Sequence, residues 1–255
     1  TYADALRKHP KIFDDLYCNM VEAGETGGIL DTILNRLAGY MEKSITLKRQ
    51  VKSAMVYPVV VVTVACTVVI FLMYAVIPTF AKIFTSLGAN LPLPTQIVIG
   101  ASQFIEKNIL FIIGGVIGGI VGLRYIKKTE KGGKTMDAIA LKLPVFGILL
   151  RKVAVAKFTR TLSTLIASGV PILEGLEITA KTAGNKIIEE AIMKTRVSIS
   201  EGKSISEPLQ ATEVFPTMVT QMIAVGESTG ALDAMLEKIA DFYDEEVDIA
   251  VQNLT

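Results

Sequence analysis

The sequence predicts an all-α membrane protein in which duplicated cytoplasmic antiparallel helical-bundle domains are linked by a transmembrane helical hairpin. Three observations predict this fold: a long stretch without charged residues, a shorter apolar stretch further along the chain, and an internal repeat between the flanking polar regions. The composition agrees, since 51% of the residues are hydrophobic while 20% are charged, a mixture that favours membrane helices joined to polar domains. The net charge of +1 excludes a nucleic-acid binder driven by bulk charge.

Residues 1–52 are interpreted as the C-terminal part of a first cytoplasmic helical domain. Amphipathic helical patterns lie on both sides of the segment GETGG, at residues 24–28. Because the connection is short, the two helices are expected to lie antiparallel as a hairpin.

The first predicted transmembrane helix covers residues 53–82. Ser53 to Ala81 contains no charged residue, whereas a span of about 30 Å needs roughly 20 apolar residues in a helix. A soluble core helix rarely stays uncharged for so long, because one of its faces meets water. Tyr57 and Pro58 lie at the entry of this segment and Pro78 at its exit.

A second transmembrane helix is predicted at residues 107–126. Its core, NILFIIGGVIGGIVGL, carries no charge. Its small residues are spaced so that they form a flat stripe on one helix face, which favours close packing against the first span or a second copy. The alternative is that glycine is simply tolerated in lipid. The stripe consists of Gly114, Gly115, Gly118, Gly119 and Gly122.

The basic residues set the expected topology. They cluster before the first span and after the second, while only Lys82 and Lys107 lie between the spans. By the positive-inside rule both flanks are cytoplasmic. The intervening segment, residues 83–106 with the proline-punctuated sequence LGANLPLPTQ, is expected to be a loop on the outer face, which is the periplasm of a Gram-negative cell.

Residues 127–255 are interpreted as a second cytoplasmic helical domain. Three helices are predicted at Ala154–Ala167, Ile172–Thr182 and Lys186–Ser200, separated by the turn sequences SGVP, which includes Gly169 and Pro171, and AGN. Strand-like alternation is not evident, so this domain is expected to be all-helical.

The two polar regions are related to each other. A shift of 202 residues aligns Phe13–Lys52 with Phe215–Leu254 without a gap, and ten of the forty positions are identical. An internal repeat of this kind indicates a duplicated domain. If the duplication extends further, a third span follows Thr255, and half of the first domain precedes Thr1.

Each repeat contains the sequence GE-x-x-G between its two predicted helices, with Gly24, Gly28, Gly226 and Gly230 as the glycines. We expect Gly24 and Gly226 to end the first helix in a left-handed conformation. Ser228 or Thr229 is expected to cap the next helix. These loops are candidate structural or interaction elements.

Glu25 and Glu227 follow the first glycine of each loop. One possibility is that these carboxylates bind a cation. The favoured interpretation is that each accepts hydrogen bonds from backbone N–H groups at a helix N-terminus.

The repeats differ in charge after the second helix. Met41–Lys52 has a balance of +3, while Tyr243–Leu254 has a balance of −4. The acidic residues are Asp244, Glu245, Glu246 and Asp248. They form either a solvated helix face or a surface that docks a basic partner, namely an ATPase or the basic end of a neighbouring copy.

The residues offer no catalytic, metal or cofactor site. His9 is the only histidine, so neither a histidine metal cluster nor a Ser–His–Asp triad is expected. The GGK sequence at residues 132–134 lacks the remainder of a phosphate-binding loop. Cys18 and Cys66 are interpreted as inert thiols.

A transporter or channel subunit is the competing class. It predicts ionisable or polar residues or broken helices within the membrane, but the interior of the first span offers only Thr63, Thr67, Cys66 and Tyr74. A receptor enzyme would need a catalytic constellation, which is not found.

Gln50 to Pro78 resembles the signature of the type II secretion system F family. In that pattern a Tyr-Pro enters the membrane helix and an aliphatic pair with proline leaves it, here Tyr57, Pro58, Val76, Ile77 and Pro78. LPVFG at 143–147, FTRTLSTLIASGVPILEGL at 158–176 and both GE-x-x-G loops also resemble family motifs. Within the family the chain is most similar to the type IV pilus platform proteins.

The resemblance implies a scaffold without chemistry of its own in the bacterial inner membrane. Such proteins sit below a growing pilus or secretion fibre as homo-oligomers. The implied partners are a cytoplasmic assembly or retraction ATPase, pilin or pseudopilin subunits, and other inner-membrane components.

Overall fold

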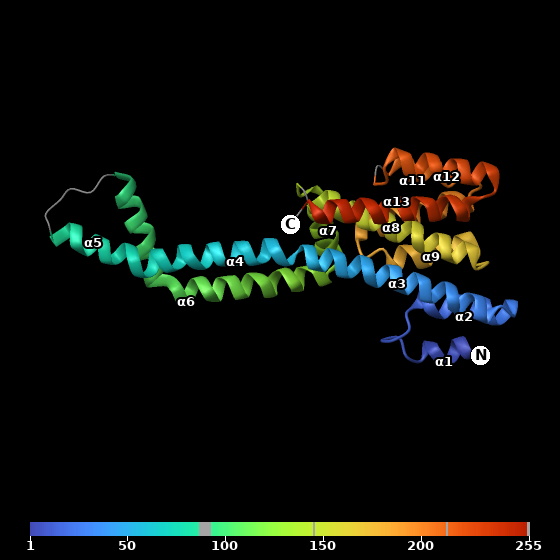
Figure 1. Ribbon diagram of the computed structural model, residues 1–255, viewed down its shortest axis with the longest axis horizontal. Coiled ribbons are helices and arrows are strands. Elements are labelled where there is room, and N and C mark those ends of the chain that lie inside the picture. The colour runs from blue at the N-terminus through green and yellow to red at the C-terminus, as the bar shows by residue number, and fades with distance from the viewer. Residues whose placement is uncertain (87–92, 145, 213, 254–255) are drawn as a thin grey trace. The chain divides into compact units, whose positions relative to one another are not determined.

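The computed structural model describes residues 1–86, 93–144, 146–212 and 214–253, and its regular structure there is entirely helical (Figure 1). The chain divides into two compact units. The first combines Thr1–Ser53 with Lys131–Leu254, and the second contains Ala54–Glu130. The first unit therefore joins the two polar regions of the sequence.

The N-terminal part of the first unit contains α1 (Tyr2–Arg7), α2 (Asp15–Gly27) and α3 (Leu30–Ala54). Thr1 forms a capping box with Asp4 at the start of α1, and the Asp14 side chain accepts the N–H of Tyr17 to cap α2. Both caps satisfy backbone donors that have no partner inside a helix.

Seven helices follow in the C-terminal part of this unit: α7 (Glu130–Lys142), α8 (Phe146–Ala167), α9 (Ile172–Thr182), α10 (Lys186–Ser200), α11 (Ser206–Ala211), α12 (Thr217–Thr229) and α13 (Leu232–Gln252). The predicted helices at 172–182 and 186–200 are confirmed with the same bounds. The predicted helix at 154–167 begins earlier, at Phe146, because the apolar pattern of α8 extends back to that residue.

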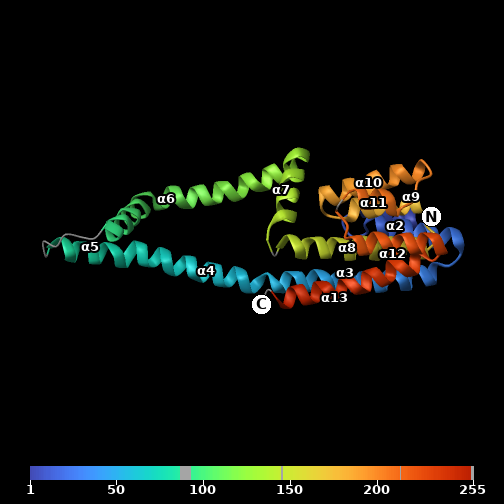
Figure 2. The same ribbon diagram turned by 90° about the horizontal axis from the view of Figure 1, so that it is seen from above.

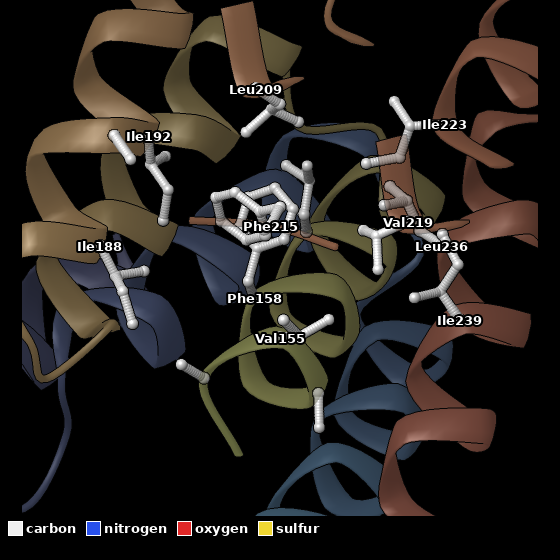
Figure 3. Close-up of a cluster of buried hydrophobic side chains, with 14 of the residues drawn as sticks. Val155, Phe158, Ile188, Ile192, Leu209, Phe215, Val219, Ile223, Leu236 and Ile239 are labelled. Atoms are coloured by element: carbon white, nitrogen blue, oxygen red, sulfur yellow. The ribbon is translucent and has the colours of Figure 1, made fainter. Parts of the chain in front are cut away.

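The main core surrounds α8, which packs along α13 (Figure 2). Phe158 of α8 is buried beside Phe215, with ring centroids 4.8 Å apart. Side chains from α10, α11, α12 and α13 join this pair (Figure 3), and Leu176 and Ala180 of α9 belong to the same cluster. Burial of this apolar surface is the dominant stabilising contribution to the bundle.

A second cluster joins the N-terminal helices to α8 and α9. Leu16, Val21 and Ile33 are buried together with Leu165 and Ile178. Residues 1–53 therefore share a hydrophobic core with residues that lie more than a hundred positions later in the chain.

The second unit contains α4 (Val56–Phe71), a π-helical turn η1 (Leu72–Val76), α5 (Ile77–Ser86) and α6 (Leu93–Lys128). The described side chains of α4 are mostly apolar and exposed. The run Leu30–Phe80 contains one window that is long and apolar enough to cross a membrane, none of it buried. A membrane-associated helix at this place agrees with the first predicted span.

The structure differs in part from the loop predicted at residues 83–106, because helices extend into it from both ends. Of LGANLPLPTQ, residues 87–92 lie outside the described residues, but α5 extends to Ser86 and α6 begins at Leu93. Pro94 is compatible with a helix here because it lies in the first turn, where its missing N–H would have no partner. Residues 107–126 are helical within α6, with non-helical angles at Asn108. Their membrane insertion stays a prediction.

Candidate functional site

The two GE-x-x-G segments are the first candidate site, and each is a tight junction between two helices. Gly24 lies inside α2 and Gly226 inside α12, and both are buried. A Cβ built on Gly24 would lie 2.9 Å from Ile33 Cγ1, and one on Gly226 would lie 3.0 Å from Met235 Cβ. Glycine is required at these positions because the next helix passes directly against the backbone.

The left-handed conformation predicted for Gly24 and Gly226 is therefore wrong. The positive φ angles belong to Gly28 (68°) and Gly230 (70°), four residues later. The first helix runs one turn further than predicted, because the short residues between the glycines continue its hydrogen-bonding pattern. The Ile29 N–H then bonds the Gly24 carbonyl, and the Ala231 N–H bonds that of Gly226, which is a Schellman ending.

The predicted capping of α13 by Ser228 or Thr229 is also wrong. The N-cap of α13 is Ala231, which makes no side-chain cap. Both hydroxyls instead donate to the carbonyl of Val225, within α12. They lie in the last turn of the preceding helix, where this internal carbonyl is within reach.

The two glutamates bind backbone N–H groups as the favoured interpretation predicts. Glu25 accepts from Tyr2 at 2.7 Å and from Ala3 at 3.0 Å, and both oxygens of Glu227 accept from Ile205 at 3.0 Å. The backbone bonds from Ala3 and Tyr2 lower the pKa of Glu25. Each carboxylate thus holds the short helix that precedes its hairpin.

These contacts recur at positions 202 residues apart. Ala3 corresponds to Ile205, Glu25 to Glu227, and Gly28 to Gly230. The bounds of α2 and α12 also correspond under the same shift. The sequence alone identified the repeated glutamates and glycines but not this bond, whose backbone donors, Ala3 and Ile205, lie 22 residues before the glutamate in each copy.

The turn between α8 and α9 contains the predicted residues Gly169 and Pro171. Gly169 has a φ of 83°, which only glycine adopts without strain. Pro171 is the N-cap of α9, and its carbonyl accepts the N–H of Gly175 at 2.8 Å. This predicted turn is confirmed, and its geometry explains both residues.

The acidic end of α13 is the second candidate site. Arg160 of α8 contacts Asp241 at 2.7 Å and Asp244 at 2.6 Å, and Lys152 contacts Glu246 at 2.5 Å. Glu245 is exposed. Two of the four predicted docking acids, Asp244 and Glu246, therefore have partners within their own bundle, so reversing their charges would disturb folding as well as docking.

Sequence analysis missed three residues of this cluster, Lys152, Asp241 and Arg160, and Arg160 is the most buried of them. Its side chain is only 14% exposed, and its Nε, in the part of the chain that the structure describes, has no hydrogen-bond partner. The sequence contains one signal for this cluster. Two basic residues lie eight positions apart on one helix, and a second helix carries the acidic residues that can pair with them.

A groove of about 430 Å³ opens beside this cluster. The LPVFG segment forms one wall, through Leu143 and Gly147, and Phe242 of α13 forms another. Gly147 is required because the backbone of Leu141 occupies the space where a Cβ would lie. Arg151 and Lys142 give the rim of the groove a positive character.

The predicted membrane residues belong to the second unit. Pro58 lies in the first turn of α4 beside exposed Tyr57, and Pro78 lies near the start of α5, directly after the π-helical turn. Each glycine of the stripe on α6 would accept a Cβ without any described atom within 4 Å. The stripe therefore has room for a closely packed neighbour.

Comparison with known proteins gives a consistent result. The family model described as "Type II secretion system (T2SS), protein F" matches residues 1–78 and again residues 158–255. The chain is 52% identical over its whole length to a protein named type IV pilus assembly protein PilC from Myxococcus xanthus, and covers 61% of that protein.

Two further relatives are similar over nearly the whole chain. The type IV pilus assembly protein PilC of Thermus thermophilus is 46% identical, with 100% of this chain and 63% of the relative covered. The type II secretion system protein F of Aeromonas hydrophila is 38% identical, with 98% and 64% covered. The chain thus spans about three-fifths of the length of these relatives.

Proposed function

The chain belongs to the type II secretion system protein F family, and we propose that it forms the central part of an inner-membrane platform that couples a cytoplasmic hexameric ATPase to the insertion or removal of pilin subunits at the base of a pilus. The observation that supports this most strongly is its similarity over its whole length to relatives named for type IV pilus assembly. In this proposal the protein is a scaffold, and catalysis belongs to the ATPase.

The proposed topology places both polar regions in the cytoplasm, with residues 53–82 and 107–126 as a transmembrane hairpin. The apolar window within Leu30–Phe80 supports the first span. The distribution of basic residues supports the orientation. In a bacterium with two membranes, the protein lies in the inner one.

Domain duplication is part of the same proposal. The family model matches two segments of the chain, and the carboxylate bonds of Glu25 and Glu227 correspond under the 202-residue shift. We refer to residues 1–53 as the first repeat and to residues 203–254 as the second repeat.

A pilus system is favoured over a secretion system because four of the five relatives named for pilus or fimbrial assembly share 42 to 52% identity with the chain and the fifth 37%, against 38, 34 and 35% for the three named for secretion. Pilin is accordingly the favoured subunit and pseudopilin the alternative.

The coupling is tested with the purified protein in detergent and the assembly ATPase of the same organism. The proposal predicts that the two form a complex and that the protein changes the rate of ATP hydrolysis. The Myxococcus xanthus relative with its own ATPase serves as the matched control. Absence of a complex, under conditions in which the control pair associates, would contradict the coupling role.

A further inference from the structure

The π-helical turn η1 lies directly before a proline and leaves one backbone carbonyl without a donor. The N–H of Ile77 bonds the carbonyl of Leu72, five residues earlier, whereas in an α-helix it would bond the carbonyl of Met73. The next position that can reach Met73 in a π turn is Pro78, which has no N–H. The carbonyl of Met73 therefore has no donor within its own helix.

Ser102 of α6 supplies the missing donor. Its hydroxyl donates to the carbonyl of Met73, and α6 packs beside this turn (Figure 1). Ser102 is 0% exposed, and among the residues of the second unit whose burial the structure describes it is the only buried polar one. A buried hydroxyl and a buried carbonyl each destabilise a fold when they are left unpaired. This single bond satisfies both groups.

The bond distinguishes between two registers of the helix. If the turn were α-helical, Ile77 would bond Met73, and the carbonyl without a donor would be that of Tyr74, against which the ring of Pro78 would press. The two registers differ by one residue, which corresponds to a rotation of α5 by about 100° and a shift of about 1.5 Å along its axis. Because Ser102 bonds Met73, it stabilises the π register alone.

The part of α6 that carries Ser102 has a point at which it can bend. Asn108, six residues further along, has non-helical angles, with φ at −115° and ψ at 15°. Its side chain donates to the carbonyl of Phe104, one turn earlier. An interruption of the backbone hydrogen-bonding pattern is a common cause of helix bending. A bend at Asn108 moves Ser102 away from Met73 without requiring a change in the rest of α6.

We propose that Ser102 is an interhelical latch that holds the first predicted span in its π register at Pro78, and that movement of Ser102 away from Met73 releases α5. The inference goes beyond the proposed platform role, because the bond depends only on the fold of the second unit. The proposed position of this helix in a membrane strengthens the latch, since lipid offers no donor to a free carbonyl.

The test follows hydrogen–deuterium exchange of residues 72–86 by mass spectrometry, with the purified protein in lipid nanodiscs. The variant Ser102→Ala removes the donor. The matched control is Thr67→Ala, because the hydroxyl of Thr67 bonds the carbonyl of Thr63 within its own helix. We expect exchange at least fivefold faster than wild type in the Ser102 variant, because local opening of the turn and of α5 becomes easier, and a change below twofold in the control.

The variant Pro78→Ala tests the physical cause. It restores an N–H that can reach the carbonyl of Met73 or of Tyr74, so Ser102 is no longer needed. We expect Ser102→Ala to change exchange by less than twofold when Pro78→Ala is also present. If Ser102→Ala alone lost helicity by circular dichroism, the double variant should still fold, and the comparison would be made in that background.

Unchanged exchange in Ser102→Ala would overturn the inference. Equal acceleration with and without Pro78 would also overturn it, since the turn would then depend on packing and not on the free carbonyl. Binding of the assembly ATPase is measured on the same samples. A wild type that fails to bind the ATPase would count against the proposed function alone, because the exchange comparison does not depend on that contact.

Discussion

Glu227 holds the backbone N–H of Ile205 through both carboxylate oxygens, each at 3.0 Å, and thereby fixes the segment that leads into α11. Glu25 holds the start of α1 in the same manner. The glutamate of each GE-x-x-G segment is therefore a structural link between a helical hairpin and the chain that precedes it.

Replacement of Glu227 by Gln should destabilise the bundle by about 1–3 kcal/mol, since a charge-assisted hydrogen bond to a partly buried donor is weakened. The free energy of unfolding is measured by urea titration in detergent. Glu237→Gln, on an exposed position of α13, is the control and should lie within about 0.5 kcal/mol of wild type. Equal stability of both variants would contradict the structural role.

Glu25 should make the stability depend on pH. Its pKa is lowered in the folded protein by the backbone N–H groups of Ala3 and Tyr2, so the unfolded chain binds its proton first. The stabilisation is complete above the ordinary pKa of about 4.3, and it is lost as the pH falls through the lower folded value. Melting temperatures of wild type and Glu25→Gln should therefore converge on acidification. If the difference between the two melting temperatures stayed constant as the pH falls, Glu25 would not contribute to the pH dependence of stability.

Gly226→Ala should destabilise the second repeat by about 1–3 kcal/mol, because the added Cβ meets Met235 Cβ at 3.0 Å and the Leu232 backbone at 3.1 Å. Gly226→Val should destabilise the second repeat more than Gly226→Ala does, because its side chain is larger. Gly39→Ala is the matched control, since it lies exposed in α3 with open space around it, and it should stabilise by about 0.5–1 kcal/mol. A Gly226→Val protein that melts like wild type yet fails to bind the proposed ATPase partner would make the loop an interaction site.

Arg160 should couple energetically to Asp244. In a double-mutant cycle with Arg160→Met and Asp244→Asn, we expect a coupling of about 1–3 kcal/mol, because Arg160 is only 14% exposed. The exposed pair Lys134 and Glu190 serves as the control and should couple by less than about 1 kcal/mol. Similar coupling free energies in both pairs would show that the burial of Arg160 does not strengthen its interaction with Asp244.

The sequence was sufficient for the features that depend on local pattern. The bounds of α9 and α10 follow from capping residues and apolar periodicity, with Asn185 and Pro171 as the boundary signals. The repeat was also visible, because its glycines and glutamates are identical in type and spacing.

Local pattern does not encode pairing between distant helices. Tyr40 and Thr161 lie 121 residues apart, and nothing in either segment indicates the other. The conformations of Gly24 and Gly226 were misassigned for a related reason. A glycine before a turn is compatible both with a left-handed ending and with close helix packing, and only the position of Ile33 or Met235 distinguishes the two.

The platform role is tested most directly in a cell that lacks its own type IV pilus assembly protein PilC, such as a Myxococcus xanthus deletion strain. The 255 residues replace the aligned segment of that relative, which is 52% identical, and surface pili are counted with twitching motility as a second readout. We predict that the chimera restores pili. A chimera that is present in the inner membrane at the wild-type level, but leaves the cells without pili, would contradict the account.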